Sequence, residues 1–86
     1  MQCLVYKSSR RPDTFVYVAH ADALKRLPPE LQQGLGALIE VLQFELTAER
    51  KLAREDARRV LDNIASIGFH VQFPPASHIF LPDPTP

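Results

Sequence analysis

The chain has few cysteines, which could cross-link a small protein through disulfides, and few glycines, which form phosphate-binding loops. Its 86 residues include one cysteine, one methionine, three glycines and no tryptophan. The single cysteine, Cys3, excludes an intramolecular disulfide and is typical of a reducing compartment. The glycines of the Gly34-Leu35-Gly36 segment are too few for a phosphate-binding loop and do not precede the right kind of element. A disulfide scaffold and a phosphate loop are therefore both excluded.

Net charge and long apolar runs are also missing. Ten basic residues balance ten acidic ones, so the chain has no overall attraction to nucleic acid or to an anionic membrane. No run approaches the 18 or more apolar residues of a membrane-spanning helix, and the stretch before Lys7 is too short for a signal peptide. We expect a cytoplasmic protein with no membrane partner. At 86 residues and 45% hydrophobic, it should form one domain with one core.

The first third of the chain predicts two strands and two short helices. Residues 2–8 and the β-branched and aromatic stretch 14–19 read as a hairpin with a polar, cationic tip. Asp22 is suited to cap a short helix, which Pro28 then interrupts. Pro29 suits the first turn of a second short helix that ends at Gly34 or Gly36.

The next stretch, residues 35–46, fits two patterns. Its leucines and Ile39 follow a helical stripe, whereas Leu42, Phe44 and Leu46 alternate as they would in a strand with one wet face. We favour the strand because Val41 and Phe44 fall off the helical stripe.

The rest of the folded part is clearer. Apolar residues recur at helical spacing from about residue 54 to residue 67, and Gly68 is placed to end that helix. Phe69, Val71 and Phe73 then alternate with His70 and Gln72 as in a strand, which Pro74 and Pro75 stop. The predicted order is β-β-α-α-β-α-β. We therefore expect an α+β fold in which helices cover a small, mostly antiparallel sheet.

Three segments of the chain resemble the YcgL-domain family of small proteobacterial proteins. They are LVYKSSRRPDTFVYV, LPPELQQGLG and RKLAREDARRVLDNIASIGFHVQFPP, of which the terminal GFHVQFPP is the most specific. The resemblance implies an α/β sandwich over residues 1–75 and a strand at about residues 40–46. It implies no known activity and no catalytic residues, and a departure at Leu35, Ala37 and Leu38 affects how the second helix packs. The composition of residues 76–86 indicates a proline-rich tail.

The strongest candidate site is the hairpin tip, which combines ammonium, guanidinium and hydroxyl donors suited to phosphate or carboxylate groups. Its alternative is a solvated tip whose charge keeps an exposed turn soluble. Lys51 and Arg54 extend the patch if they lie nearby. The candidate anion-binding or partner-binding residues are Lys7, Ser8, Ser9, Arg10, Arg11, Lys51 and Arg54.

Catalytic and metal sites are weakly supported. Cys3 lies within a strand, where a buried small side chain is the simpler interpretation than a nucleophile paired with His20, His70 or His78. Ser8 and Ser9 lack the strand-turn-helix context of a nucleophile elbow. The three histidines have no spacing typical of a metal site. We therefore expect no metal, no cofactor and no catalytic residue.

The tail carries one apolar triplet, Ile79, Phe80 and Leu81, among prolines. It could dock on a partner, pack back on its own domain or remain disordered. Together these features favour a non-catalytic interaction module that binds a partner protein or a phosphate-bearing ligand. A nucleic-acid-associated factor linked to RNA processing is the alternative, and a small hydrolase-like enzyme is the weakest. The oligomeric state is left open.

Overall fold

The computed structural model describes residues 1–52 and 55–73, and within them four strands and three helical segments alternate in the predicted order. The α+β class expected from the sequence is confirmed. The elements are β1 (Gln2–Ser8), β2 (Phe15–Val18), the 3-10 helix η1 (Ala21–Arg26), α1 (Pro29–Leu35), β3 (Leu38–Glu45), α2 (Ala57–Ile67) and β4 (Phe69–Gln72).

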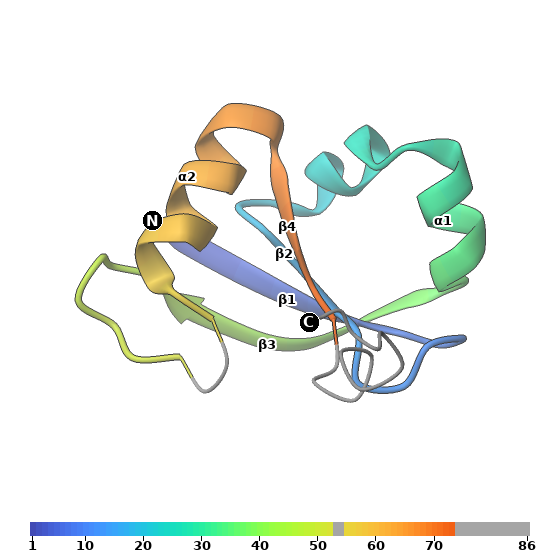
Figure 1. Cartoon of the computed structure of the whole chain (residues 1–86), viewed down its shortest axis with the longest axis horizontal. Coiled ribbons are helices and arrows are strands. Elements are labelled where there is room, and N and C mark those ends of the chain that lie inside the picture. The colour runs from blue at the N-terminus through green and yellow to red at the C-terminus, as the bar shows by residue number, and fades with distance from the viewer. Residues whose placement is uncertain (53–54, 74–86) are drawn as a thin grey trace, which may run out of the picture.

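The sheet is built around its first hairpin. β1 and β2 form the antiparallel hairpin that the sequence predicted. In its register Lys7 lies opposite Phe15, and Asp13 takes a positive φ of 69° in the turn. β3 then pairs with the free side of β1 and β4 with the free side of β2, which gives the order β3-β1-β2-β4 (Figure 1). Every pair is antiparallel, and in this order β3 and β4 are the outer strands of the sheet that residues 1–52 and 55–73 form.

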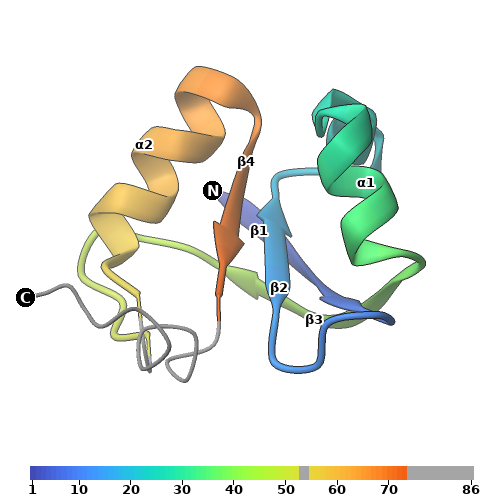
Figure 2. The same cartoon turned by 45° about the vertical axis from the view of Figure 1, so that its right-hand side comes forward.

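Helices cover both faces of this sheet. Alternate residues of a strand point to opposite faces, so Cys3 and Val5 pack under α2 whereas Tyr6 packs under η1 and α1. Figure 2 shows α2 and α1 on opposite sides of the strands. Two apolar clusters result, one on each face, with the middle strands contributing to both. The arrangement is the helix-covered sandwich that the resemblance implied.

β3 resolves the ambiguous stretch in favour of a strand. The register with β1 shifts by one residue, because Val5 lies opposite Leu42 while Tyr6 lies opposite Glu40. Val41 is therefore the extra residue of a β-bulge. The bulge breaks the strict alternation of the strand, which explains why periodicity alone could not separate helix from strand here.

The helix ends follow local chemistry, with two corrections to the sequence-based boundaries. α2 begins at Ala57 rather than near residue 54, because Asp56 caps it by accepting a hydrogen bond from the Arg58 N–H at 3.0 Å. The prediction that Asp22 caps the first helix is wrong, because η1 begins at Ala21 and its N-cap residue, His20, makes no side-chain cap hydrogen bond. Gly68, at a φ of 98°, ends α2 as predicted. Within the described residues, no helix has the length and apolar character needed to cross a membrane.

Candidate functional site

The hairpin tip, Lys7 to Arg11, is tied to the turn between α1 and β3. The buried Ser8 hydroxyl donates a hydrogen bond to the Leu35 carbonyl oxygen and accepts one from the Arg11 N–H at 3.0 Å. The Ser9 hydroxyl oxygen accepts a hydrogen bond from the Ala37 N–H at 2.9 Å. Both hydroxyls, which the sequence suggested as ligand donors, thus make internal hydrogen bonds that hold the tip in place.

The three cations of the tip remain exposed. None of Lys7, Arg10 and Arg11 forms an ion pair with another residue of the described ranges. Lys7 lies on the same face of β1 as Val5, whereas the Arg10 side chain lies close to Gly36 on the α1–β3 turn. The tip therefore offers three exposed cations, while its two serine hydroxyls are engaged in internal hydrogen bonds.

Lys51 does not belong to the tip. Ser8 lies opposite Leu38 and Gln2 lies opposite Glu45, so the segment after β3 starts at the far end of β1 from the hairpin turn. Figures 1 and 2 both place this segment and the hairpin turn at separate ends of the molecule. Arg54 lies outside the described residues, as do Ile79, Phe80 and Leu81 of the tail.

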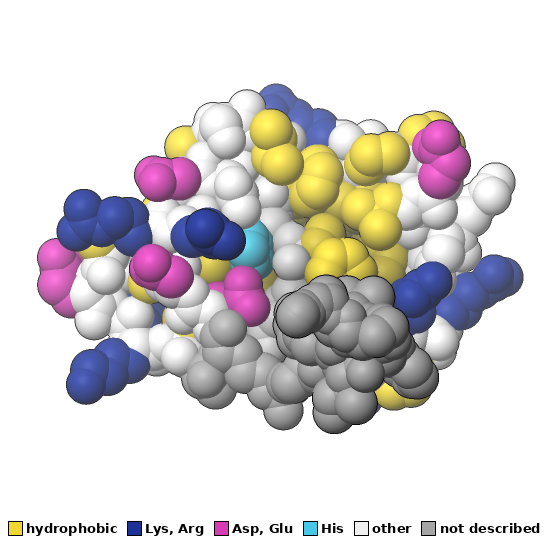
Figure 3. Space-filling model, viewed as in Figure 1, with side chains coloured by type: hydrophobic (Ala, Val, Ile, Leu, Met, Phe, Trp, Pro, Cys, Tyr) yellow, Lys and Arg dark blue, Asp and Glu magenta, His cyan; other side chains and the backbone are white. Residues whose placement is uncertain are grey.

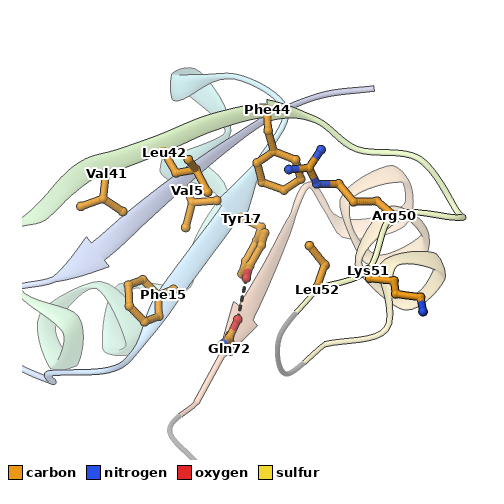
Figure 4. A pocket seen from close by; sticks show the side chains of 10 residues that line it. All are labelled: Val5, Phe15, Tyr17, Val41, Leu42, Phe44, Arg50, Lys51, Leu52 and Gln72. Atoms are coloured by element: carbon orange, nitrogen blue, oxygen red, sulfur yellow. Dashed lines mark hydrogen bonds between the residues drawn. The ribbon is translucent and has the colours of Figure 1, made fainter.

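A pocket opens on the α2 side of the sheet, where the helix leaves part of the strands uncovered (Figure 4). Its volume is about 290 Å³. The Arg50 guanidinium lies 4.4 Å from the centre of the Phe44 ring, a cation–π contact, and Figure 4 shows the Lys51 ammonium pointing away from the pocket. Apolar side chains from three strands and the β3–α2 segment form most of its lining: Val5, Phe15, Tyr17, Val41, Leu42, Phe44 and Leu52.

The outer wall of this pocket continues into an exposed apolar strip on β3. Ile39, Val41 and Leu42 are 58%, 50% and 52% exposed, although each is a large aliphatic side chain. The bulge at Val41 brings Val41 and Leu42 to the same side, so both line the pocket. We call these three residues together with the free backbone edge of β3 the β3 surface. Contiguous exposed apolar residues of this kind mark interaction sites in soluble proteins.

Hydrophobic side chains also gather on the opposite face, over η1 and between β4 and α1 (Figure 3). Leu24, Leu31, Phe69 and Val71 are only partly buried against the cluster there, and Phe73 is half exposed just beyond β4. Apart from Phe73, these side chains belong to the second core cluster and are more covered than those of the β3 surface.

Cys3 is not in a position to act as a nucleophile. It is fully buried under α2, and burial raises the pKa of its thiol to about 11. With this pKa the thiol is protonated at neutral pH, and it is also shielded from solvent. Since the thiolate is the reactive form of cysteine, Cys3 is unreactive in the folded chain. The structure thus places Cys3 as a small core residue.

His70 and Glu55 are bound to each other within the fold. His70 is buried between Asn63, at 2.8 Å from the ring Nδ1, and the carboxylate of Glu55, which meets the ring Nε2. The Tyr17 hydroxyl donates to the side-chain oxygen of Gln72, and burial raises the pKa of Tyr17. Across residues 1–52 and 55–73, no three histidine, cysteine or acidic side chains converge in a way that could hold a metal ion. His78 lies outside these ranges.

Sequence reasoning missed the β3 surface and its neighbour Arg50. The signal was present in the run Leu38-Ile39-Glu40-Val41-Leu42, which has apolar residues at positions of both parities. Unless the register shift at Val41 is known, this pattern does not show which of the apolar residues lie on the same face of the sheet. The pairing of β3 with β1 supplies that information.

Comparison with known proteins gives a consistent result. The model of the YcgL domain matches residues 3–75. A YcgL domain-containing protein of Thioalkalivibrio sulfidiphilus is 48% identical over 75 residues, which cover 87% of this chain and 93% of the relative. A YcgL domain-containing protein of Pseudomonas aeruginosa is 44% identical over 79 residues, covering 92% of this chain and 81% of the relative. The chain belongs to the YcgL domain family.

Proposed function

We propose that this chain is a non-catalytic, cytoplasmic binding module that engages a partner polypeptide through the β3 surface. The observation that supports the proposal is the exposure of Ile39, Val41 and Leu42, each at least half exposed, next to an apolar pocket. Leaving three large aliphatic side chains in water on one short strand is unfavourable unless a partner covers them.

The edge position of β3 adds a second support. One side of β3 pairs with β1, and its other side is the outer edge of the described sheet. Such an edge presents unpaired N–H and C=O groups that a partner strand can bind, while side-chain pockets select the partner's residues. The pocket behind Val41 and Leu42 lies where the side chains of an added strand would reach.

Photo-cross-linking in the native cell tests this proposal. A photoreactive phenylalanine analogue at Val41 should give a discrete protein adduct, identified by mass spectrometry. The matched control carries the same analogue at Ala65, an exposed residue of α2. The Val41 adduct should disappear when Ile39→Lys is added to the same chain. Adducts that are the same from both positions, or that persist with Ile39→Lys, would contradict the proposal.

A second candidate function is binding of a phosphate-bearing ligand, including RNA, at the hairpin tip. It is favoured by the exposure of Lys7, Arg10 and Arg11, which have no carboxylate partner among the described residues. The internal hydrogen bonds of Ser8 and Ser9 remove two donors from this candidate. It therefore ranks below the β3 surface.

A further inference from the structure

We propose that the partner of the β3 surface is a second copy of this chain, paired antiparallel through β3 about a two-fold axis between Val41 and Leu42. This inference rests on the proposed function and names its partner. The argument comes from the symmetry of β3 itself, first in its backbone and then in its side chains.

The backbone groups on the free edge of β3 can be assigned from the ladder with β1. The Leu46 N–H donates to the Met1 carbonyl oxygen at 2.7 Å, and successive residues of an antiparallel strand direct their backbone groups to opposite sides. The backbone N–H and C=O groups of Phe44 and Leu42 therefore point toward β1, like those of Leu46. The backbone groups of Glu45 and Gln43 point away from β1, to the outer edge of the sheet.

The same reasoning holds beyond the bulge. The Ser8 N–H donates to the Thr14 carbonyl oxygen at 3.1 Å on the β2 side, so the odd residues of β1, including Lys7, direct their backbone groups toward β3. Ile39 lies opposite Lys7, so the backbone N–H and C=O groups of Ile39 point toward β1. Leu38 and Glu40 consequently direct their N–H and C=O groups to the free edge.

The free edge is therefore symmetric about the bulge. Its outward residues are Leu38, Glu40, Gln43 and Glu45, which are related in pairs by reversal about the point between Val41 and Leu42. A two-fold axis at that point places Glu40 opposite Gln43 of the second copy and Leu38 opposite Glu45. A one-residue slip would bring outward residues of one strand against inward residues of the other, so this register is the one in which both edges match.

The side chains obey the same symmetry. Ile39, Val41, Leu42 and Phe44 lie on the α2 side, because Leu42 and Phe44 pair with Val5 and Cys3 and Val41 lines the same pocket. The two-fold operation therefore joins these four residues with their copies into one apolar strip across both sheets. It sets no carboxylate opposite another carboxylate, since Glu40 meets Gln43.

β3 lacks two of the usual protections against edge pairing, lysine and proline, although it carries two glutamates and the bulge at Val41. Natural edge strands commonly carry lysine or proline, and the sequence of β3, LIEVLQFE, contains neither. An edge of eight residues with three exposed aliphatic side chains and a self-complementary pattern matches what a symmetric strand pairing requires.

Sedimentation equilibrium of the purified full chain tests the dimer. Over about 1 to about 500 µM, the average mass should rise from 9.7 kDa toward twice that value. Val41→Lys should weaken the dimer by about tenfold or more, because two ammonium groups would meet near the axis. Ala65→Lys, a matched change on the exposed face of α2, should leave it unchanged, and circular dichroism checks that both variants fold.

Disulfide trapping tests the register. In a Cys3→Ala background, a mixture of Glu40→Cys and Gln43→Cys chains should form a mixed disulfide dimer, whereas each variant alone should form much less. A mass that stays at 9.7 kDa throughout, or trapping that is equal in the mixture and in the single variants, would overturn the two-fold pairing.

If the chain is monomeric and the Val41 photo-adduct contains another protein, the proposed binding module is supported and the pairing of two copies is wrong. If the chain dimerises but Val41→Lys has no effect, the dimer uses a different surface and this inference fails.

Discussion

The Ser8 hydroxyl donates a hydrogen bond to the Leu35 carbonyl oxygen, 27 positions further along the chain. This contact joins the end of β1 to the end of α1, and the same oxygen atom of Ser8 accepts from the Arg11 N–H. A residue that looked like part of a ligand site from the sequence is instead a link between the hairpin turn and the helix beside it.

Ser8→Ala should therefore destabilise the fold. The change removes the Ser8 partner of the Arg11 N–H and one of the two donors to the Leu35 carbonyl, whose other donor is the Arg10 N–H at 3.2 Å. Loss of a partner by a buried polar group costs about 1 to 3 kcal/mol. Urea unfolding followed by circular dichroism measures the free energy of unfolding. Ser66→Ala, which removes an exposed hydroxyl from α2, is the control and should change that free energy by less than about 0.5 kcal/mol. Equal stability of the Ser8→Ala variant and the native chain would show that the link is dispensable.

Two glycines, two positions apart in the sequence, should respond to alanine with changes of opposite sign in the free energy of unfolding. Gly36 has φ 72° and ψ −146°, and a Cβ there would lie 2.6 Å from the Arg10 Cγ and 2.7 Å from the Ser9 Oγ. Gly36→Ala should lower the free energy of unfolding by about 1 to 3 kcal/mol. Gly34 lies inside α1, and a Cβ there would meet no atom within 4 Å, so Gly34→Ala should raise it by about 0.5 to 1 kcal/mol.

Thermal or urea unfolding of the two alanine variants side by side checks this pair. Both substitutions add the same methyl group, so a gain of stability from Gly36→Ala would contradict the positive φ at Gly36 and the close approach of the hairpin tip to it.

The buried thiol of Cys3 should make the fold sensitive to alkaline pH. Burial raises the pKa of Cys3 from 9.0 to about 11, so the folded state keeps its proton where the unfolded state loses it. The resulting stabilisation is fully present below about pH 9 and is lost as the pH rises toward 11, for a total of about 2 to 3 kcal/mol.

Cys3→Ala isolates this contribution, since Tyr6 and Tyr17 also have raised pKa values and lose protons in alkaline solution. The free energy of unfolding should fall more steeply between about pH 9 and about pH 11 for the native chain than for Cys3→Ala. Parallel pH profiles would contradict a buried, protonated thiol. Consistently, iodoacetamide should label Cys3 at neutral pH only after unfolding.

The hairpin tip can be tested with a single-stranded oligoribonucleotide as the probe. If the tip contacts phosphates, the logarithm of the affinity should fall with the logarithm of salt concentration with a slope of about −0.7 for each contact. Arg10→Glu combined with Arg11→Glu should then abolish binding. Arg58→Glu combined with Arg59→Glu, an equal change of charge on the exposed side of α2, should have a smaller effect. Unchanged RNA affinity in the first double variant would exclude the tip as a phosphate site.

Local patterns were enough to predict the order of elements. The apolar stripe at Val60 and Ile64, the C-cap at Gly68 and the alternation after Phe69 each specify their element through interactions a few residues long. The strand at residues 38–45 was predicted with less support, because the bulge at Val41 places two successive apolar residues on one face. That feature arises from pairing with β1 and has no local signature.

The site was less predictable for the same reason. The roles of Ser8 and Ser9 depend on Leu35 and Ala37, which are 27 and 28 positions away. The polar residues of β4 gave no sign of burial either. His70 is buried because α2 covers that face of the sheet and supplies Asn63, with Glu55 from the segment before the helix. Such roles come from tertiary packing, which spacing in the sequence does not encode.

The strand order β3-β1-β2-β4 also bears on how the chain folds as it is made. The strands synthesised first, β1 and β2, occupy the centre of the sheet and pair locally as a hairpin. β3 then adds to one side and β4, after α2, to the other. Each later strand thus meets a template that already exists when it leaves the ribosome, because β1 and β2 can pair with each other before β3 and β4 are translated.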